Sequence, residues 1–585
     1  MFERLRYLVP FFRPYRRRLV GGMASILASV AIGLFAPLLV GWAVDALRQD
    51  VSMRTLLFYA GLLIAITAVM GVFSYLQRMI LVTMSREIEL DLRNEYFAKL
   101  EALSVSFYQE HRTGDLMARA TNDLQAVRML CGPAIMYSSN TLFTAIGALA
   151  FMVAIHPLLT LVSLATMPLV AWVTHFVGQR IHVLFERVQE SFSDLSTRVQ
   201  ENLAGVRVVR AYAREGSERR LFAAANDDYV ERNKRLIRWD AAFRPALQAL
   251  VGLGFVVVLG YGGWLVVGGE ITVGQFVTFN LFLGELVWPM IAIGWVINLL
   301  QRGTASLARI RRVLDEEPRV LDAPDAVDPG EIDGAVAVRD LTFDYGVGEA
   351  AGQPVLHGID FAVPAGATVA LVGRTGSGKS TLLSLLPRLF EPPPGTVFID
   401  DRDVRTLQLE PLRRAIGVVP QETFLFSTTV RENIAFGRPE AADDEVREAA
   451  RLAGLDADLE GFPQGLDTVV GERGITLSGG QKQRVALARA ILRQPRILML
   501  DDALSAVDTH TEETILRNLR EVFVGRTVFL VSHRISTVQA ADLILVLDDG
   551  RVAERGDHDS LVAHGGIYAD LHQRQLLEEE LAATA

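Results

Sequence analysis

Residues 371–381 read LVGRTGSGKST and match the spacing G-x-x-x-x-G-K-[ST], which binds polyphosphates in proteins. The glycines let backbone N–H groups turn inward around phosphate oxygens, and the helix that follows adds its positive end. Lys379 would reach the β- and γ-phosphates, and Ser380 would hold Mg²⁺. The run therefore predicts a nucleotide site that contains Gly373, Thr375, Gly376, Ser377, Gly378, Lys379, Ser380 and Thr381.

Further polar residues stand near short apolar strands on either side of this loop. Asp501, in ILMLDDALSAVD, ends a strand and fits a Mg²⁺ ligand, and Asp502 falls where a general base belongs. Gln421, in VVPQETFLF, lies at a strand end from which it would reach Mg²⁺ or the attacking water. His533, in FLVSHR, would contact the γ-phosphate. Tyr345, in VRDLTFDYG, is an upstream aromatic residue that would stack on a base.

The elements that carry these residues alternate between short apolar strands and helices from Val336 onward. This alternation predicts an α/β domain with a largely parallel core sheet. The first half is different, because its apolar residues gather into blocks of about twenty, the length that crosses a bilayer core of roughly 30 Å. We expect an all-α transmembrane domain with six spans at roughly 19–45, 57–79, 131–155, 158–178, 246–268 and 274–300.

The composition of the chain excludes several kinds of site and of partner. Residues 1–18 hold six arginines and one acidic residue with interleaved aromatic side chains, which predicts an amphipathic segment on the cytoplasmic face of a membrane. The single cysteine, Cys131, excludes an internal disulfide and a cysteine-rich metal site. The chain has no basic domain of the kind that binds nucleic acid, so that class of partner is set aside. We expect a multi-pass protein of the cytoplasmic membrane whose nucleotide-binding domain lies in the cytoplasm.

Two long links between spans, 80–130 and 179–245, are charged and helical in pattern. We expect each to project into the cytoplasm as a helix that leads out and a helix that leads back. Breaks at His111–Asp123 and near Arg214–Ser217 would form short transverse helices that dock on another domain. The alternative at each break is an ordinary turn between helices.

Glu285 is the strongest polar candidate at membrane depth, and Arg244 and His175 lie near the ends of their spans. A carboxylate inside a membrane is costly and usually faces a cavity or a partner. Glu285 is therefore our candidate for the substrate path, with a hydrogen bond between helices as the alternative.

The run LSGGQKQR at 477–484 completes the set of motifs. With the phosphate loop and the paired acids in their order, it resembles the signature of the ATP-binding-cassette family. Six spans before the cassette resemble a type IV exporter half-transporter with domain-swapped helices. The resemblance implies a second half-transporter subunit, with each ATP held between the phosphate loop of one subunit and the LSGGQ of the other. It assigns contact with the partner's nucleotide to Ser478, Gly479, Gly480 and Gln481. It assigns communication across the dimer to Asp508. Contact between the cassette and the transmembrane part is assigned to Val469–Gly474 and to the breaks near Gly114 and Gly216.

Asp502 departs from the family pattern, since most active cassettes carry glutamate there. An aspartate carboxylate is one methylene shorter and is drawn back about an ångström or more from the attacking water, which slows general-base catalysis. An altered base beside an intact signature resembles the degenerate-site subunit of heterodimeric multidrug exporters. We therefore expect an unlike partner with a catalytic glutamate, and ATP-driven export of a hydrophobic or amphipathic drug, lipid or peptide with ATP and Mg²⁺ as cofactors. The alternatives are a homodimeric lipid or drug flippase with a working Asp502, and a nucleotide-gated channel or regulator.

These observations predict five parts of the chain. They are the N-terminal segment 1–18, the transmembrane domain 19–310, a charged and proline-containing linker 311–335, the nucleotide-binding domain 336–575 and a C-terminal tail 576–585.

Overall fold

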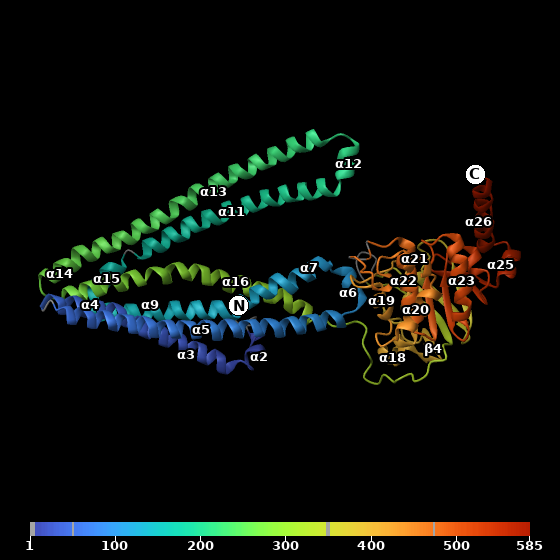
Figure 1. Cartoon of the computed structure of the whole chain (residues 1–585), viewed down its shortest axis with the longest axis horizontal. Helices are drawn as coiled ribbons and strands as arrows, with labels where there is room; N and C mark the ends of the chain where they lie inside the picture. Colours follow the sequence, from blue (N-terminus) through green and yellow to red (C-terminus); the bar gives the residue numbers. More distant parts are fainter. Residues whose placement is uncertain are drawn as a thin grey trace. The chain divides into compact units, whose positions relative to one another are not determined.

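The computed structural model describes residues 6–49, 52–165, 167–346, 352–471, 474 and 476–584. The chain forms two compact units (Figure 1). Unit 1 comprises Met1–Lys99 and Met117–Asp315, and unit 2 comprises Leu100–Leu116 and Glu316–Ala585. A short stretch of the first half of the chain thus packs with the second unit.

Unit 1 is helical throughout its described residues. Its helices are α2 (Val9–Phe12), α3 (Arg16–Gly33), α4 (Phe35–Gln49), α5 (Met53–Ala102, whose last turn enters unit 2), α7 (Thr113–Ala118, shared between the units), α8 (Leu124–Met129), α9 (Ile135–Ile155), α10 (Pro157–Leu164), α11 (Met167–Ala204), α12 (Val206–Ala211), α13 (Glu215–Val257), α14 (Gly263–Val267), α15 (Val273–Glu285) and α16 (Val287–Leu314). Three π-helical turns interrupt them at Arg119–Asp123, Leu130–Ala134 and Val258–Gly262. The second turn accommodates Pro133, which lacks the N–H that an unbroken helix requires.

Five helical runs among the described residues are long and apolar enough to cross a membrane. They are Arg16–Arg48, Met53–Ala102, Thr113–Ile155, Glu215–Val267 and Val273–Leu314, and they match five of the six expected spans to within one residue at the end of 246–268. The remaining expected span, 158–178, is divided between α10 and α11, and residue 166 lies outside the described residues. Large apolar side chains of α5 such as Leu57 and Ile64 are exposed, which fits a surface that meets lipid.

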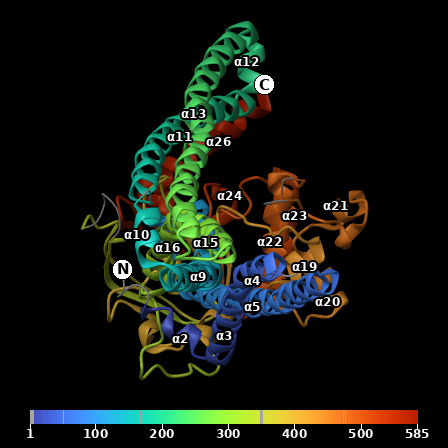
Figure 2. The same cartoon turned by 90° about the vertical axis from the view of Figure 1, so that its left-hand side faces the viewer.

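The two predicted projections each contain a short helix. Helix α6 (Val105–Glu110) follows α5 and begins after Ser104, whose extended backbone ends the preceding helix. Helices α11 and α13 run side by side and are joined by α12 (Figures 1 and 2). The breaks themselves are short non-helical links at 111–112 and 212–214, and a short helix, α6 or α12, lies directly before each of them. Docking of these short helices on another domain stays a prediction.

Unit 2 contains two sheets. The larger has the order β10-β9-β3-β8-β7-β6, and its strands are β3 (Thr368–Val372), β6 (Ile416–Val419), β7 (Ile497–Asp501), β8 (Thr527–Val531), β9 (Leu543–Asp548) and β10 (Arg551–Gly556). Strands β9, β3, β8, β7 and β6 pair with one another in parallel, and β10 pairs with β9 antiparallel. The smaller sheet is antiparallel, with the order β2-β1-β4-β5 and the strands β1 (Val336–Phe343), β2 (Leu356–Val363), β4 (Val397–Ile399) and β5 (Arg402–Asp403). The predicted parallel core is confirmed.

The larger sheet is buried on both faces, as the apolar run in β7 requires. Leu498 and Leu500 point into one core, whereas Ile497 and Met499 point into the other. Helices α19, α20, α22 and α23 cover the first face, and the smaller sheet and α17 cover the second. Besides α6, the α-helices of this unit are α17 (Lys379–Leu385), α18 (Leu409–Arg414), α19 (Val430–Ala435), α20 (Asp443–Leu452), α21 (Asp456–Gly461), α22 (Gly479–Leu492), α23 (Thr509–Phe523), α24 (Ile535–Val538), α25 (His558–His564) and α26 (Ile567–Thr584).

Candidate functional site

Four adjacent parallel strands bring the predicted site residues to one edge of the larger sheet. The phosphate loop follows β3, His533 follows β8, Asp501 ends β7 and Gln421 follows β6. Loops at the carboxyl ends of parallel strands meet at one edge, which is where such sheets bind ligands. The loops enclose a cavity of about 240 Å³ lined by Val355, Thr375, Gly376, Gly378, Lys379, Ser380, Thr381, Gln421, Asp501, Asp502, Val531 and His533.

The phosphate loop needs glycine for steric reasons. Gly373 has φ +149°, and a Cβ atom there would lie 2.1 Å from the carbonyl oxygen of Leu547. Lys379 is only 6% exposed, and its Nζ donates to the carbonyl oxygens of Gly373 and Arg374 at 2.8 Å each. Burial lowers the pKa of Lys379, while the nearby Asp501 and Asp502 oppose that effect. The loop thus holds a compact ammonium group beside the space for phosphate oxygens.

Asp501 and its neighbours provide hard oxygen donors. Burial raises the pKa of Asp501 above its ordinary value, and a hydrogen bond from Ser380 acts in the opposite direction. Ser380, Gln421 and Asp501 line the same cavity and offer hydroxyl, amide and carboxylate oxygens, the ligands that Mg²⁺ prefers. The residues present therefore fit a nucleotide with its magnesium ion.

Asp502 adopts a left-handed backbone conformation with φ +50°. A short polar side chain tolerates this conformation better than most, and such strain gathers at functional sites. Its N–H donates to the carbonyl oxygen of Val531 at 3.0 Å, which ties the residue to β8. The Oδ2 atom lies 3.8 Å from Nε2 of His533, so the two side chains face each other across the cavity.

Tyr345 is not among the described residues that line the cavity, but it touches the loop helix. Its hydroxyl lies 2.7 Å from Oγ1 of Thr381, and its ring packs edge-on against Phe343 and Phe390. The ring therefore stands beside the phosphate loop, and base stacking by Tyr345 remains a prediction.

The signature residues lie apart from this cavity. Ser478 caps α22, where its Oγ accepts from the N–H of Gln481 at 3.3 Å and its own N–H donates to Oε1 of Gln481 at 2.8 Å. Gly479 begins the helix, and Gly480 packs so closely that an added Cβ would lie 2.8 Å from the carbonyl oxygen of Ala506. None of the four residues Ser478, Gly479, Gly480 and Gln481 lines the cavity of its own chain. They form a capped helix end on a different part of unit 2.

Asp508 caps α23, and Oδ1 accepts from the N–H of Thr511 at 3.0 Å. This hydrogen bond lowers the pKa of Asp508.

Several residues that support the site have no role assigned to them by the motifs, although one of them, Gln483, lies within the run LSGGQKQR. Gln483, in the middle of α22, is buried and donates to the carbonyl oxygen of Asp502 at 3.3 Å, while its Oε1 accepts from the N–H of Ala506 at 3.0 Å. Glu512 in α23 is buried and accepts hydrogen bonds from Arg534 and from Thr537. These contacts tie the segments around Asp502 and His533 to helices far away in sequence, so local spacing cannot reveal them.

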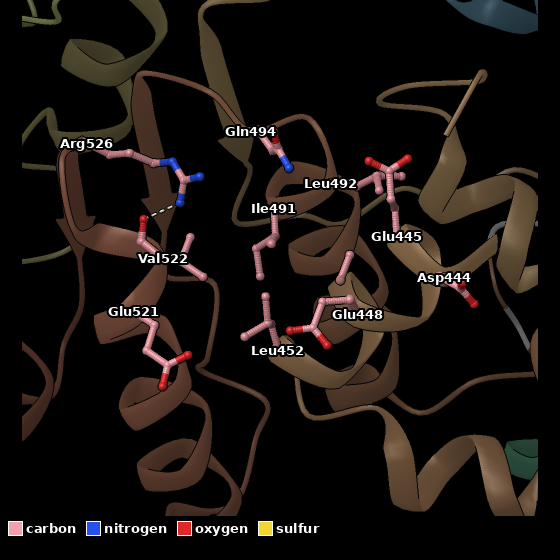
Figure 3. A pocket seen from close by; sticks show the side chains of 11 residues that line it. Asp444, Glu445, Glu448, Leu452, Ile491, Leu492, Gln494, Glu521, Val522 and Arg526 are labelled. Atoms are coloured by element: carbon pink, nitrogen blue, oxygen red, sulfur yellow. Dashed lines mark hydrogen bonds between the residues drawn. The ribbon is translucent and has the colours of Figure 1, made fainter. Parts of the chain in front are cut away.

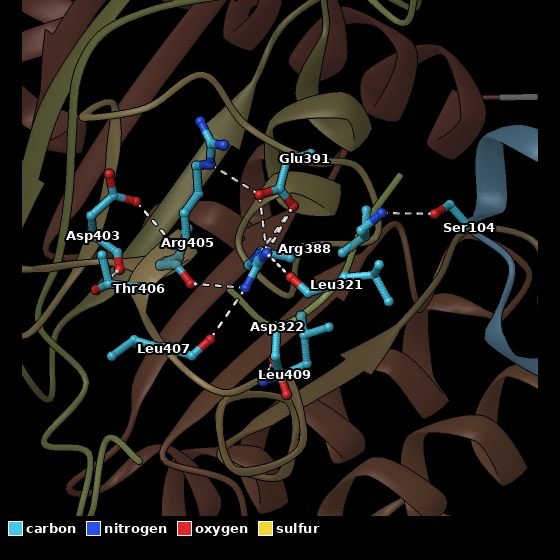
Figure 4. Close-up of polar contacts among 12 residues, drawn as sticks. Ser104, Leu321, Asp322, Arg388, Glu391, Asp403, Arg405, Thr406, Leu407 and Leu409 are labelled. Carbon is cyan, nitrogen blue, oxygen red and sulfur yellow. Dashed lines mark hydrogen bonds and ion pairs between the residues drawn. The ribbon is translucent and has the colours of Figure 1, made fainter. Parts of the chain in front are cut away.

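Helix α6 belongs to unit 2, its Phe107 is buried, and its N-cap contacts the segment that leads to β1. Oγ of Ser104 accepts from the N–H of Val320 at 2.9 Å. The next residue, Leu321, accepts from Nη2 of Arg388 at 2.9 Å (Figure 4). Arg388 is 1% exposed and pairs with Glu391 at 3.0 Å, and Nη1 donates to the carbonyl oxygens of Val404 and Leu407. A connected polar network therefore runs from α6 to the segment that follows α17.

A larger hollow of about 440 Å³ lies between α20, α22 and α23, with acidic side chains around an apolar floor (Figure 3). Two of its acids are already engaged, because Glu445 accepts from the N–H of Ala442 at 2.9 Å and Glu448 pairs with Arg451 at 2.6 Å. None of the predicted site residues lines it.

Of the other predicted positions, Glu285 is described, whereas His175, Arg244 and the stretch 469–474 are described only in part. Glu285 ends α15 and is partly exposed. The side chains of His175 and Arg244 lie outside the described residues, as do Glu472 and Arg473 in the stretch 469–474.

Comparison with known proteins agrees with this arrangement. Residues 19–290 match the ABC transporter transmembrane region, and residues 356–505 match the ABC transporter family. The chain is 40% identical to the probable multidrug resistance ABC transporter ATP-binding/permease protein YheI of Bacillus subtilis (strain 168), covering 99% of this chain and 98% of the relative. It is 34% identical to the ATP-dependent lipid A-core flippase of Syntrophus aciditrophicus (strain SB), covering 99% of this chain and 95% of the relative.

A solved structure of a bacterial Atm1-family ABC exporter with ATP bound is similar as well. The TM-score is 0.78 at 31% identity, and the match covers 96% of this chain and 98% of that chain. Full-length matches at this level settle family membership and an ATPase coupled to transport. This chain belongs to the ABC transporter family.

Proposed function

We propose that this chain is the degenerate-site half of a heterodimeric ATP-driven exporter in the cytoplasmic membrane. The observation that carries the proposal is the pairing of Asp502 at the base position with a complete signature at Ser478–Gln481 that lies outside the chain's own cavity. Such a chain would bind ATP with its phosphate loop and hydrolyse it slowly. Its signature would complete the site of an unlike partner that carries glutamate.

The transported substrate in this proposal is hydrophobic or amphipathic. Support comes from the names of the relatives, one a probable multidrug resistance transporter and another a lipid A-core flippase. A pathway formed by apolar helices such as α15 and α16 suits the same class of solute. Glu285, where α15 ends, is the residue we assign to the substrate path.

The roles of the site residues follow from their positions. Lys379 would neutralise phosphate charge, and Ser380, Gln421 and Asp501 would hold Mg²⁺, which neutralises charge on the phosphates when it is bound. Asp502 and His533 face each other across the same cavity. Asp502 would take a proton from the attacking water, and His533 would donate a hydrogen bond to the γ-phosphate.

Movement of the transmembrane helices would be linked to the nucleotide through α6. Ser104 contacts the segment around Val320, and that segment contacts the buried Arg388. A displacement of the residues around α17 on nucleotide binding would therefore reach α6 through hydrogen bonds and packed side chains.

The test compares the full-length chain alone with the chain co-purified with an unlike half-transporter encoded beside it, both in lipid nanodiscs. We expect low ATPase activity from the chain alone and high activity from the pair. In the pair, Asp502→Ala should change the rate little, whereas replacing the partner's glutamate should abolish turnover. High activity of the lone chain that is lost in Asp502→Ala would instead establish the homodimer.

The homodimeric flippase is a second candidate because the cavity holds a complete set of polar groups, including Asp502 and His533 in mutual contact range. The lipid A-core flippase among the relatives supports it too. In that case the lone chain would translocate fluorescent lipid in proteoliposomes when MgATP is added.

A further inference from the structure

His533 sits on a short segment that the sheet does not hold. The strand β8 ends at Val531, and α24 begins at Ile535, so Ser532, His533 and Arg534 bridge the gap. The imidazole is about half exposed and faces Asp502. A catalytic side chain on a short loop requires contacts from elsewhere to keep its backbone in position.

Gln575 of α26 supplies such contacts on both sides of His533. Its Nε2 donates to the carbonyl oxygen of His533 at 2.7 Å. Its Oε1 accepts from the N–H of Ile535 at 2.7 Å, one of the free N–H groups at the start of α24. Both ends of the Gln575 side-chain amide are hydrogen-bonded, so its two partners define which way the amide group faces.

Helix α26 is itself anchored to the core of unit 2. Tyr568 is fully buried in the helix-covered core, and Leu571 packs against the same core. Residues 568, 571 and 575 are spaced by three and four, so they share one face of the helix. Glu554 accepts from the N–H groups of Ile567 and Tyr568 at the start of the helix. Gln575 therefore extends from a fixed helix face rather than from a free tail.

We propose that Gln575 is a positioning residue for ATP hydrolysis, which holds the backbone of His533 so that the imidazole meets the γ-phosphate. The proposal rests on the proposed role of His533. It makes the C-terminal helix part of the nucleotide machinery, although the helix contributes no residue to the cavity lining.

The test uses the full-length chain co-purified in lipid nanodiscs with the unlike half-transporter, whose catalytic glutamate is replaced so that phosphate release reports this chain's own site. It compares Gln575→Ala, His533→Ala and the double variant. Gln573→Ala is the matched control, since Gln573 lies on the same helix with an exposed side chain. Two readouts are measured: the single-turnover rate of phosphate release, and the ratio of ATP affinity to ADP affinity. The affinity ratio reports the γ-phosphate contact even when turnover is slow.

We expect Gln575→Ala to lower the single-turnover rate by about tenfold or more and to reduce the ATP-to-ADP affinity ratio, with ADP affinity unchanged. The double variant should match His533→Ala within about twofold, because a residue that acts through His533 has nothing to position once the imidazole is gone. Gln573→Ala should match the wild type. Normal values for Gln575→Ala, additive losses in the double variant, or a loss of ADP affinity would overturn the proposal. A wild-type chain that binds no MgATP would overturn the proposed function itself.

Discussion

The rate of hydrolysis at this chain's own nucleotide site should depend on how far one side chain, that of Asp502, reaches into the cavity. Its carboxylate lines the cavity beside Asp501, and its left-handed backbone is held by Val531 on one side and Gln483 on the other. The surrounding contacts thus specify where the Cα atom lies, and the length of the side chain decides how far the carboxylate reaches. Aspartate in this conformation is also less strained than a longer residue would be.

Replacing Asp502 by glutamate tests whether the rate depends on how far the carboxylate extends toward the attacking water. We expect Asp502→Glu to raise the single-turnover rate at this chain's own site roughly tenfold or more, because the added methylene carries the base toward the attacking water. Asp502→Asn is the matched control and should lower the rate, since an amide takes no proton. The measurement is phosphate release from ATP bound at limiting concentration. An Asp502→Glu rate at or below the wild-type value would mean that the aspartate is already well placed.

Lys379 is the cation that the phosphate loop places in the nucleotide cavity. Its ammonium is enclosed by the carbonyl oxygens of Gly373 and Arg374, and a planar guanidinium needs more width than this space provides. We expect Lys379→Arg to weaken ATP binding by at least about tenfold, which corresponds to roughly 1.4 kcal/mol. Lys234→Arg, at an exposed position on α13 and outside the cavity lining, should leave the affinity unchanged. Equilibrium titration with labelled ATP measures both, and equal affinities in the two variants would contradict the assignment.

At the scale of elements, the network around Arg388 links α6 to the residues after α17. The guanidinium is fully enclosed, and its partners come from the segment before β1, from the turn after β5 and from Glu391. Removing the buried guanidinium leaves its carbonyl partners without a donor, which is costly, and Glu391 then pairs with Arg405 alone. The hydrogen bond between Ser104 and Val320 continues this network to α6.

Arg388→Leu should therefore destabilise unit 2 by about 3 kcal/mol, because three carbonyl oxygens lose their donor and Glu391 keeps only Arg405 as a partner. Arg405→Leu is a matched control, since Arg405 donates to the same Glu391 at 3.0 Å from a side chain that is 38% exposed. Its cost should stay below about 1 kcal/mol. Thermal unfolding of the full chain in nanodiscs, followed by intrinsic fluorescence, compares the two. Equal shifts in the unfolding temperature would contradict the special role of the buried pair.

Sequence patterns predict the features that contiguous residues encode. The phosphate loop, the strand that ends in Asp501 and the long projecting helices are encoded in contiguous runs, and they form where the patterns indicate. The adjacency of β3, β8, β7 and β6 arises from pairing between distant segments. Gln575 contacts His533 across 42 residues, and no motif marks it. The hydroxyl contact from Tyr345 to Thr381 likewise depends on tertiary packing, which spacing alone does not encode.

Two exposed surfaces of the molecule would be covered by the second subunit in the proposed assembly. The first is the capped start of α22 with Ser478, which lies outside the cavity of its own chain. The second is α12, which has no buried residue. Val208 of α12 is 61% exposed, and Tyr212, which directly follows the helix, is 75% exposed. Apolar side chains at the tip of a long helix pair are costly in water, so coverage by another subunit stabilises them.

A charge placed on α12 tests that second surface. We expect Val208→Arg to reduce substrate-stimulated ATPase activity and transport by about tenfold, because an arginine cannot enter an apolar interface without a partner. Binding of ATP by the chain should be unchanged, since α12 is remote in sequence from every residue that lines the cavity. Val524→Arg is the control, because Val524 is also highly exposed, at 79%, and follows α23 in unit 2. Proteoliposomes that contain each variant with the co-purified partner provide the measurement. If Val208→Arg transports as well as Val524→Arg, α12 stays in solvent during the cycle, and the link between nucleotide and transmembrane helices runs through α6 alone.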